Sequence, residues 1–312
     1  MNDDKREPVL TKTRHLGFFI DLGEKMLSVT RKHSRKIVNF FNRFLMSVRL
    51  RHRIRIKELQ RMLGLQIWIS TVFRVARQFL TSICDGIRIS GSDLFFYPRR
   101  HKALVTRMIF DLRFWRRFIS NKPKTTFKAL LGRLPRNIDT LACDACTSWG
   151  MAGVIRFAGG NPRYPHCEGL FWQMTWAEWS TVHPTPALMP GNIMINEAEF
   201  LAALITCETF SEFCARKLTV LEIDSTVAKA WLDSSRCPIH PFDRYAQATH
   251  LYMLKREMKI RTSWVTSGNN GLADRCSRGF FSAGSSGHLI KGVRLRKISP
   301  KWLNMIRFYK SS

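Results

Sequence analysis

The chain has 312 residues, of which 45% are hydrophobic; this composition is typical of a folded globular protein and excludes wholesale disorder. Its formal net charge of +28 is distributed unevenly, with +22 in residues 1–136, −1 in residues 137–280 and +7 in residues 281–312. A neutral middle between two basic arms indicates a polyanionic partner, either a nucleic acid or an anionic membrane, and charge alone does not distinguish the two.

The sequence predicts a reduced, intracellular protein of the nucleus or cytoplasm that is not secreted and has no membrane span. Its polar and acidic start, Met1-Asn-Asp-Asp, is unlike a secretory signal, and its eight cysteines form no compact framework. The longest apolar run, Met62–Phe73, is too short to span a bilayer. Cys143 and Cys146 form a CxxC pair without a second pair to complete a zinc site, so two buried strand cysteines are the preferred interpretation.

Residues 1–136 are predicted to be mainly helical after a β-hairpin over 15–29, where apolar and polar residues alternate. Helical spacing of apolar residues predicts three helical stretches, at 31–48, 56–84 and 102–119. Within the second stretch, Gly64 either interrupts one helix or joins two. Residues 85–97 contain two glycines and are expected to form a loop, and Asn121–Thr126 a connector.

Residues 137–280 have a different pattern, in which strands come first and then alternate with helices. Strands are expected at 140–146, 150–157, 169–175, 218–223 and 260–265. Helices are expected at 196–216, 226–232, 244–258 and 271–276. This order predicts an α/β domain. Residues 281–312 are expected to form a basic tail with an apolar patch between Trp302 and Phe308.

Four carboxylates of the middle region lie where predicted elements begin or end: Asp144, Glu199, Asp224 and Asp274. Hydrolysis of a phosphodiester needs divalent ions, and hard Mg²⁺ takes oxygen ligands, so acidic residues from different elements are the pattern of such a site. Each residue also has a structural explanation. Asp224 and Asp274 could be helix N-caps, Glu199 a solvated helix residue, and Asp139 competes with Asp144 as the acid of the first strand.

Four motifs occur in a fixed order: Asp-Ala-x-x-x-Trp-Gly (144–150), Ile-Asn-x-x-Glu-Phe-Leu-Ala (195–202), Ile-Asp-x-Thr-Val-Ala (223–228) and Asn-x-x-Ala-Asp-x-x-Ser-Arg-Gly (270–279). Together they resemble the ribonuclease H of retroelements, most of all that of DIRS-type tyrosine-recombinase retrotransposons. The resemblance implies an α/β, ribonuclease H-like mixed sheet flanked by helices. It also implies an endonuclease that cuts the RNA strand of an RNA–DNA hybrid.

The resemblance continues upstream of residue 137. Glu7–Asp21 is similar to the segment that follows the polymerase palm, Lys57–Gly64 and Arg77–Leu80 resemble thumb helices, and Asp111–Phe118 resembles the connection. Residues 1–136 are therefore expected to be a basic, mainly helical thumb and connection region. The sequence holds no fingers and no palm with a Tyr-x-Asp-Asp-like site. No polymerase activity is expected from this chain alone, and a separate polymerase chain is a candidate partner.

The resemblance makes four residues the catalytic ligands of two Mg²⁺ ions, with Mn²⁺ as an alternative: Asp144, Glu199, Asp224 and Asp274. Asn270 would orient Asp274 or touch the nucleic acid. An Asn often follows the third carboxylate in the family, and Ser225 in its place would loosen the support of that carboxylate. The loop from Ser263 to Asn270 offers no histidine as a proton shuttle, and His250 is expected to be structural.

Basic residues at two places in the N-terminal region are expected to bind the nucleic acid backbone without reading its sequence: Arg31, Lys32, Arg35, Lys36, Arg51, Arg53, Arg55 and Lys57. The alternative is that they solvate the outer faces of helices. For the whole chain two further hypotheses stay open. One is a catalytically inactive, nucleic-acid-binding relic of a retroelement, and the other is a basic amphipathic protein on an anionic membrane.

Overall fold

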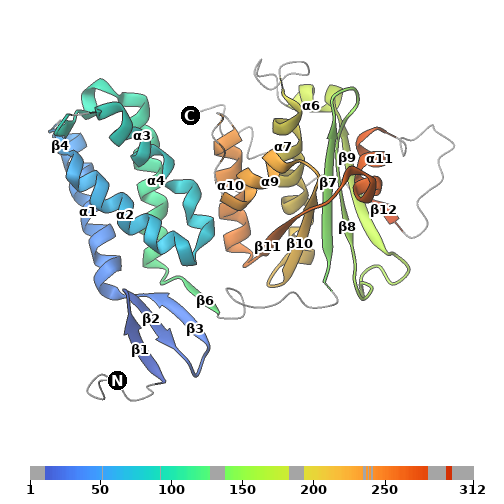
Figure 1. The fold of residues 1–312 in the computed structure, drawn as a ribbon, viewed down its shortest axis with the longest axis horizontal. Coiled ribbons are helices and arrows are strands. Elements are labelled where there is room, and N and C mark those ends of the chain that lie inside the picture. Colours follow the sequence, from blue (N-terminus) through green and yellow to red (C-terminus); the bar gives the residue numbers. More distant parts are fainter. Residues whose placement is uncertain are drawn as a thin grey trace, which may run out of the picture. The chain divides into compact units, whose positions relative to one another are not determined.

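A computed structural model of the chain describes residues 11–50, 52–91, 93–126, 138–182, 193–234, 237, 239, 242–279 and 293–296. The chain divides into two compact units, Met1–Arg133 and Leu134–Ser312 (Figure 1). The division lies three residues before the domain boundary expected at residue 136. Each unit is described below by itself.

The first unit begins with a small antiparallel sheet of strand order β1-β2-β3-β6. Its strands are β1 (Lys12–His15), β2 (Phe18–Asp21), β3 (Met26–Val29) and β6 (Lys124–Thr126). The expected hairpin is confirmed in β2 and β3. The turn from β1 to β2 needs a glycine, because Gly17 has a φ of 84° and a Cβ there would lie 2.5 Å from the ring of His33.

Four helices make up most of this unit: α1 (Arg31–Arg49), α2 (Ile56–Val72), α3 (Thr81–Ser90) and α4 (Lys102–Ser120). The three expected helical stretches are confirmed. The second of them comprises α2, a 3₁₀ turn over Arg74–Phe79 and α3, and Gly64 lies inside α2 without interrupting it. Buried aromatic side chains join the helices. Phe79 stacks on Phe114 with ring centroids 3.5 Å apart, and the indole of Trp115 donates a hydrogen bond of 2.9 Å to the Phe79 carbonyl.

The loop expected over residues 85–97 is wrong. Helix α3 covers the first part of that segment, and β5 (Phe95–Phe96) then pairs with β4 (Ile54–Arg55). Gly86 lies within α3 at the contact with α4, where an added Cβ would come within 3.3 Å of the Met108 methyl group. This glycine therefore allows close helix packing, whereas the sequence predicts it within a loop.

The second unit is built on a six-stranded sheet of order β11-β10-β7-β8-β9-β12. Its strands are β7 (Thr140–Cys146), β8 (Gly150–Arg156), β9 (Gly169–Thr175), β10 (Leu218–Ile223), β11 (Lys259–Trp264) and β12 (Val293–Leu295). β7, β8 and β9 form an antiparallel meander, whereas β10 runs parallel to β7 and β11 parallel to β10. The sheet is therefore mixed.

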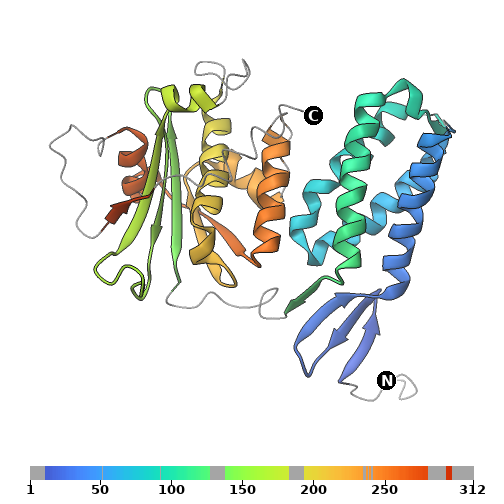
Figure 2. The same cartoon turned by 180° about the vertical axis from the view of Figure 1, so that it is seen from behind.

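Helices cover both faces of this sheet: α6 (Trp176–Val182), α7 (Ile195–Thr209), α8 (Ser211–Cys214), α9 (Thr226–Ser234), α10 (Phe242–Lys255) and α11 (Gly271–Ser277). Figures 1 and 2 show α7, α9 and α10 on one side of the sheet and α11 on the other. The larger core lies beneath α7, and a smaller one joins Ala273 and Cys276 of α11 to Ala142. The expected fold class, an α/β mixed sheet flanked by helices, is confirmed.

Two short strands lie where the sequence predicts none. β6 falls in the expected connector Asn121–Thr126, and its Lys124 pairs with Ser28, nearly 100 residues earlier. β12 falls in the expected basic tail and pairs in parallel with β9. The apolar patch of that tail lies outside the described residues. None of the helices in the described part of the chain combines the length and hydropathy that crossing a bilayer requires.

Candidate active site

Asp144 lies on the central strand β7, which is buried from Leu141 to Cys146. Because side chains alternate along a strand, Leu141 and Cys143 pack in the core beneath α7, and Ala142 packs on the opposite side with α11. Asp144 shares the α11 side with Ala142. Helices on both faces explain why this strand is an almost continuous apolar run in which Asp144 is the exception.

The Asp144 carboxylate is 5% exposed, and Oδ2 accepts a hydrogen bond from the Ser277 hydroxyl. Burial raises the pKa of Asp144 to about 6 because it disfavours the charged form. The hydrogen bond from Ser277 opposes this increase, and repulsion from Asp224 and Asp274 adds to it. Arg278 lowers the same pKa. The carboxylate is therefore held in place by the Ser277 hydroxyl and is repelled by the negative charges of Asp224 and Asp274.

Glu199 projects from α7, on the opposite face of the sheet, and is partly buried. Its Oε2 atom is buried and has no hydrogen-bond partner. Burial raises the pKa of Glu199 to about 7, hydrogen bonding with Ser225 opposes the increase, and repulsion from Asp224 and Asp144 adds to it. A helix residue that merely met solvent would have neither a buried oxygen nor this pKa.

Asp224 follows the last residue of β10. The parallel register sets Glu222 opposite Ala142, so that position 224 comes level with Asp144 on the neighbouring strand. The backbone at Asp224 is fixed by the Trp264 indole, which donates a 3.0 Å hydrogen bond to its carbonyl. The Oδ1 atom of Asp224 is buried without a partner. The end of β10 thus presents a carboxylate whose backbone is anchored and whose oxygen is unsatisfied.

Ser225 supplies the cap that Asp224 could have provided to α9. The Ala228 amide donates to Ser225 Oγ at 3.1 Å, and Ser225 Oγ lies 3.3 Å from Asn196 Oδ1 of α7. Ser225 also hydrogen-bonds Glu199. Ser225 therefore links the segment that carries Asp224 to α7, the helix that carries Glu199.

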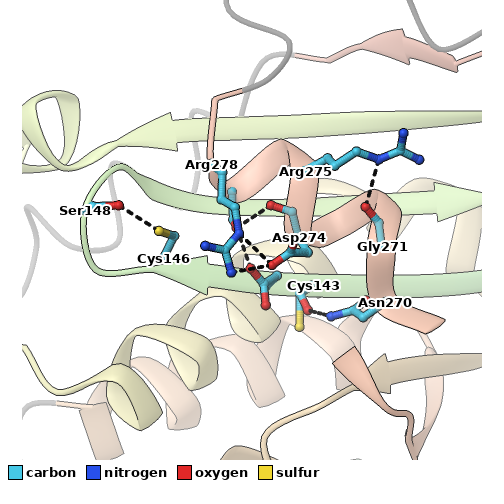
Figure 3. Close-up of polar contacts among 10 residues, drawn as sticks. Cys143, Cys146, Ser148, Asn270, Gly271, Asp274, Arg275 and Arg278 are labelled. Atoms are coloured by element: carbon cyan, nitrogen blue, oxygen red, sulfur yellow. Dashed lines mark hydrogen bonds and ion pairs between the residues drawn. The ribbon is translucent and has the colours of Figure 1, made fainter. Parts of the chain in front are cut away.

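Asp274 lies in α11 and is paired with an arginine one helical turn later. Arg278 donates from Nε to Asp274 Oδ1 at 2.8 Å, and its Nη2 lies 2.7 Å from the same oxygen (Figure 3). This i, i+4 spacing sets the two side chains on one face of the helix. Since Arg278 also lowers the pKa of Asp144, its guanidinium offsets part of the negative charge of the group.

Asn270 anchors the start of α11 to β7. It has no exposed surface, and its Nδ2 donates a 2.9 Å hydrogen bond to the carbonyl of Cys143 (Figure 3). A side chain buried in this way has no face for the nucleic-acid contact expected from the sequence. Its position supports the other expectation, that it helps to orient Asp274, because it holds the helix that carries this residue.

Two acidic neighbours of the predicted carboxylates have structural partners: Asp139, which competed with Asp144 in the sequence, and Glu197. Asp139 precedes β7 and accepts hydrogen bonds from the Ala158 amide at 3.1 Å and from Lys217 Nζ at 3.2 Å. Glu197 accepts a 3.0 Å hydrogen bond from the Met194 amide at the start of α7. Neither residue is among the main causes that shift the pKa of Asp144 or Glu199.

Asp144 interacts electrostatically with each of the three other predicted carboxylates. The negative charges of Asp224 and Asp274 raise the pKa of Asp144. Those of Asp224 and Asp144 raise the pKa of Glu199. Their side chains do not converge on one point, however. Among the residues that the structure describes, no three His, Cys, Asp or Glu side chains are grouped as the ligands of a single ion.

The chemistry of this donor set nevertheless fits hard divalent cations. All four donors are carboxylates, which Mg²⁺ and Mn²⁺ favour. Two oxygens, Oε2 of Glu199 and Oδ1 of Asp224, are buried and unpartnered. An unsatisfied buried acceptor costs about 1–3 kcal/mol, and a cation bound between these residues would remove that cost.

Of the residues predicted to bind the nucleic acid backbone, those that the structure describes in the first unit are all exposed: Arg31, Lys32, Arg35, Lys36, Arg53, Arg55 and Lys57. Arg51 lies outside the described residues. The guanidinium of Arg53 lies 4.1 Å from the centre of the Phe95 ring, a cation–π contact that restrains it at the surface.

Three residues near the carboxylates had no assigned role in the sequence interpretation: Ser277, Arg278 and Trp264. Ser277 and Arg278 belong to the fourth motif, three and four residues after Asp274, and helical spacing alone would have placed them on its side. Trp264 ends β11 opposite Ile223 in the parallel register, which only the strand pairing reveals.

No protein-family model and no curated protein matches the chain. A solved structure described as the foamy viral protease–reverse transcriptase in complex with double-stranded DNA overlaps 82% of this chain, with 14% sequence identity and a TM-score of 0.28. The overlap covers 45% of that chain, so the present chain spans less than half of its length. A likeness of this quality carries no argument about function.

Proposed function

We propose that the second unit is an Mg²⁺-dependent endoribonuclease that cuts the RNA strand of RNA–DNA hybrids, and that the first unit binds the nucleic acid backbone. One observation carries the proposal. Asp144 interacts electrostatically with Asp224 and Asp274, Glu199 interacts with Asp144 and Asp224, and both Glu199 and Asp224 have a buried oxygen without a partner. A structural role for these acids leaves that arrangement unexplained.

In this proposal the ligands of two Mg²⁺ ions are Asp144, Glu199, Asp224 and Asp274, and Mn²⁺ is an alternative. When bound, the ions would neutralise the phosphate, activate a water molecule and stabilise the leaving oxygen. The water attacks the phosphorus atom and the 3′ oxygen leaves, so the products carry 5′ phosphate and 3′ hydroxyl ends.

The chain's own residues position the acids for this reaction. The Ser277 hydroxyl fixes Oδ2 of Asp144, and the Trp264 indole fixes the backbone that carries Asp224. Arg278 partly neutralises Asp274. Together these contacts hold the carboxylates in place, although their negative charges repel each other.

Selection of the RNA strand would come from contacts to its 2′-hydroxyl groups, which DNA lacks. The first unit would raise affinity without reading sequence, because its excess of Lys and Arg neutralises phosphates. No polymerase activity is proposed for this chain, and a separate polymerase chain is a candidate partner.

The second candidate function is a nucleic-acid-binding relic of a retroelement without catalysis. It is favoured by a specific observation: among the described residues no three ligands are grouped for one ion, and Arg278 pairs with one of the four acids. Retention of all four carboxylates favours the enzyme over this relic.

The substitution Asp224→Asn tests the proposal directly. It keeps the shape of the side chain and removes its charge, so cleavage of a hybrid should fall to background while hybrid affinity measured in EDTA stays within about twofold. Glu168→Gln is the matched control, because Glu168 is an exposed acid at the start of β9 outside the carboxylate group. Loss of binding together with cleavage in Asp224→Asn, but not in the control, would count against a dedicated metal role.

A further inference from the structure

A basic cavity of about 440 Å³ lies in the first unit, where α1, the end of α4, β3 and β6 meet. Its volume is within the range of about 300–1,000 Å³ found for ligand sites. It is lined by Ser28, Val29, Arg31, Ser34, Arg35, Val38, Asn39, Ile119, Ser120, Lys122 and Lys124. Four of these side chains are cations, three are hydroxyls and none is an acid.

The four cations come from three different segments and have fixed backbone positions. Arg31 and Arg35 are one helical turn apart on α1, so they share a face. Lys122 follows α4 in the left-handed region, with a φ of 48°, and Lys124 is held in β6 by its pairing with Ser28. The convergence of like charges is therefore imposed by the fold of the unit.

Nothing described in the unit neutralises this cluster. None of Arg31, Arg35, Lys122 and Lys124 forms an ion pair with another described residue, and all four are exposed. A second cavity of about 860 Å³, between α1 and α2, differs in this respect, because its lining includes Glu58, which lies 3.8 Å from Arg43. Of these two cavities, the smaller is therefore the one in which a bound anion would gain more.

We propose that this cavity binds phosphate groups of a nucleic acid backbone. Guanidinium and ammonium groups would contact the phosphate oxygens, and the serine hydroxyls would donate further hydrogen bonds. The inference rests on the nucleic-acid partner of the proposed function, but not on cleavage. It adds Lys122 and Lys124 to the predicted contacts and joins them to Arg31 and Arg35 in one site.

A membrane surface fits this cavity less well. Proteins that lie on a bilayer bury exposed apolar side chains among the lipids. The lining of the cavity includes none of the large hydrophobic side chains that are exposed in the described residues, and its apolar members Val29, Val38 and Ile119 are at least partly buried. A recessed cationic site matches a phosphate that projects from a strand of nucleic acid.

The test is the affinity of the full chain for an RNA–DNA hybrid in EDTA, measured at several salt concentrations. We expect Lys122→Ala with Lys124→Ala to weaken binding about tenfold and to lower the slope of log K against log salt by about 1–2, because one or two phosphate contacts are lost. Lys122→Arg with Lys124→Arg should keep both values. The control pair, Lys102→Ala with Arg113→Ala, removes the same charge from exposed positions of α4 outside both cavities and should bind within twofold of the wild type.

Equal weakening by the two alanine pairs would overturn the inference, because diffuse charge would then account for binding. So would a loss that affects phosphatidylserine vesicles and spares the hybrid. Circular dichroism verifies that each variant is folded. If the hybrid is bound through the cavity but never cleaved, the nuclease proposal is contradicted and the phosphate site is supported. If the alanine pair binds and cleaves normally, the phosphate site is contradicted and the nuclease proposal is supported.

Discussion

Ser277 and Arg278 end α11 and act on two different acids. The hydroxyl of Ser277 bonds Asp144, which belongs to the central strand, and the guanidinium of Arg278 pairs with Asp274 of its own helix. One short helix therefore contributes an acid, a hydroxyl and a counter-charge to the same region of the molecule. Supporting residues of this kind set the orientation of ligands and typically change activity 10- to 100-fold when they are removed.

We therefore predict that Ser277→Ala reduces hybrid cleavage about 10- to 100-fold and leaves hybrid affinity in EDTA unchanged. Without the hydroxyl, Asp144 loses the hydrogen bond that opposes the rise of its pKa and also loses its fixed orientation. Ser148→Ala is the control, since that hydroxyl contacts Cys146 instead. Cleavage rates that are equal in the wild type and in Ser277→Ala would show that the hydrogen bond has no positioning role.

For the four carboxylates, the sequence predicted which residues could bind metal ions but not which side chains form hydrogen bonds or ion pairs with them. The motifs placed all four carboxylates in one unit, and in the structure Asp144 interacts electrostatically with each of the three others. The sequence pattern could not decide which of Asp139 and Asp144 is the functional acid, because Asp139 directly precedes the strand on which Asp144 lies. Only the packing shows that Asp139 binds Lys217, whereas Asp144 lies beneath α11.

Helix α7 packs so closely on β8 that a glycine is required between them. A Cβ on Gly153 would lie 2.0 Å from the Thr206 hydroxyl and 2.4 Å from the Trp172 indole nitrogen. These two neighbours also bond each other, since Trp172 Nε1 donates to Thr206 Oγ1 at 3.1 Å. The contact joins β8, β9 and α7 at the centre of the larger core.

We predict that Gly153→Ala destabilises the second unit by about 1–3 kcal/mol, because an added methyl group overfills a packed core. Thermal unfolding followed by circular dichroism measures the effect. Gly159→Ala is the control, as a Cβ at that position meets nothing within 4 Å. Equal melting temperatures for the two variants would contradict the packing described.

Long elements with clear periodicity were predicted well, and elements defined by distant partners were not. Helices α1 and α4 and strand β7 follow from their local patterns. β6 and β12 have three residues each and exist because another strand lies beside them, so local sequence carries no signal for them. The loop predicted around Gly86 is wrong because glycine suits both a loop and a close helix contact.

The two units differ in charge, and the acids of the second unit are expected to make its stability depend on pH. The first unit has an excess of cations, whereas the second concentrates four acids near one end of its central strand. Without cations the acids repel each other. The folded pKa values of Asp144, about 6, and Glu199, about 7, lie above the ordinary values of 3.8 and 4.5.

The sign of the resulting pH dependence follows from linkage. An acid with a raised folded pKa binds its proton more tightly in the folded state, so its contribution to stability is present at low pH and is lost as the pH rises through about 4 to 7. In EDTA, Glu199→Gln should therefore unfold like the wild type near pH 4 and should be more stable by about 1–2 kcal/mol at pH 8. This is less than the full shift would give, because part of the carboxylate meets water. A difference that is independent of pH would contradict the account.

Binding of Mg²⁺ should offset the loss of stability that the wild type shows in EDTA at high pH. A ligand that binds only the folded state raises the melting temperature, and Mg²⁺ needs deprotonated carboxylates, so the increase should grow from pH 6 to pH 8. Asp224→Asn should lose most of it. Thermal unfolding with Mg²⁺ and with EDTA measures both proteins, and an equal increase in the variant would place the ion elsewhere.

The central claim is tested most directly by incubating the full chain with a labelled RNA–DNA hybrid, in Mg²⁺ or in EDTA, beside duplex DNA and duplex RNA. The proposal predicts Mg²⁺-dependent loss of the RNA strand of the hybrid alone, with 5′ phosphate and 3′ hydroxyl ends. Tight binding of the hybrid without cleavage, in either Mg²⁺ or Mn²⁺, would contradict it and leave a folded nucleic-acid-binding relic.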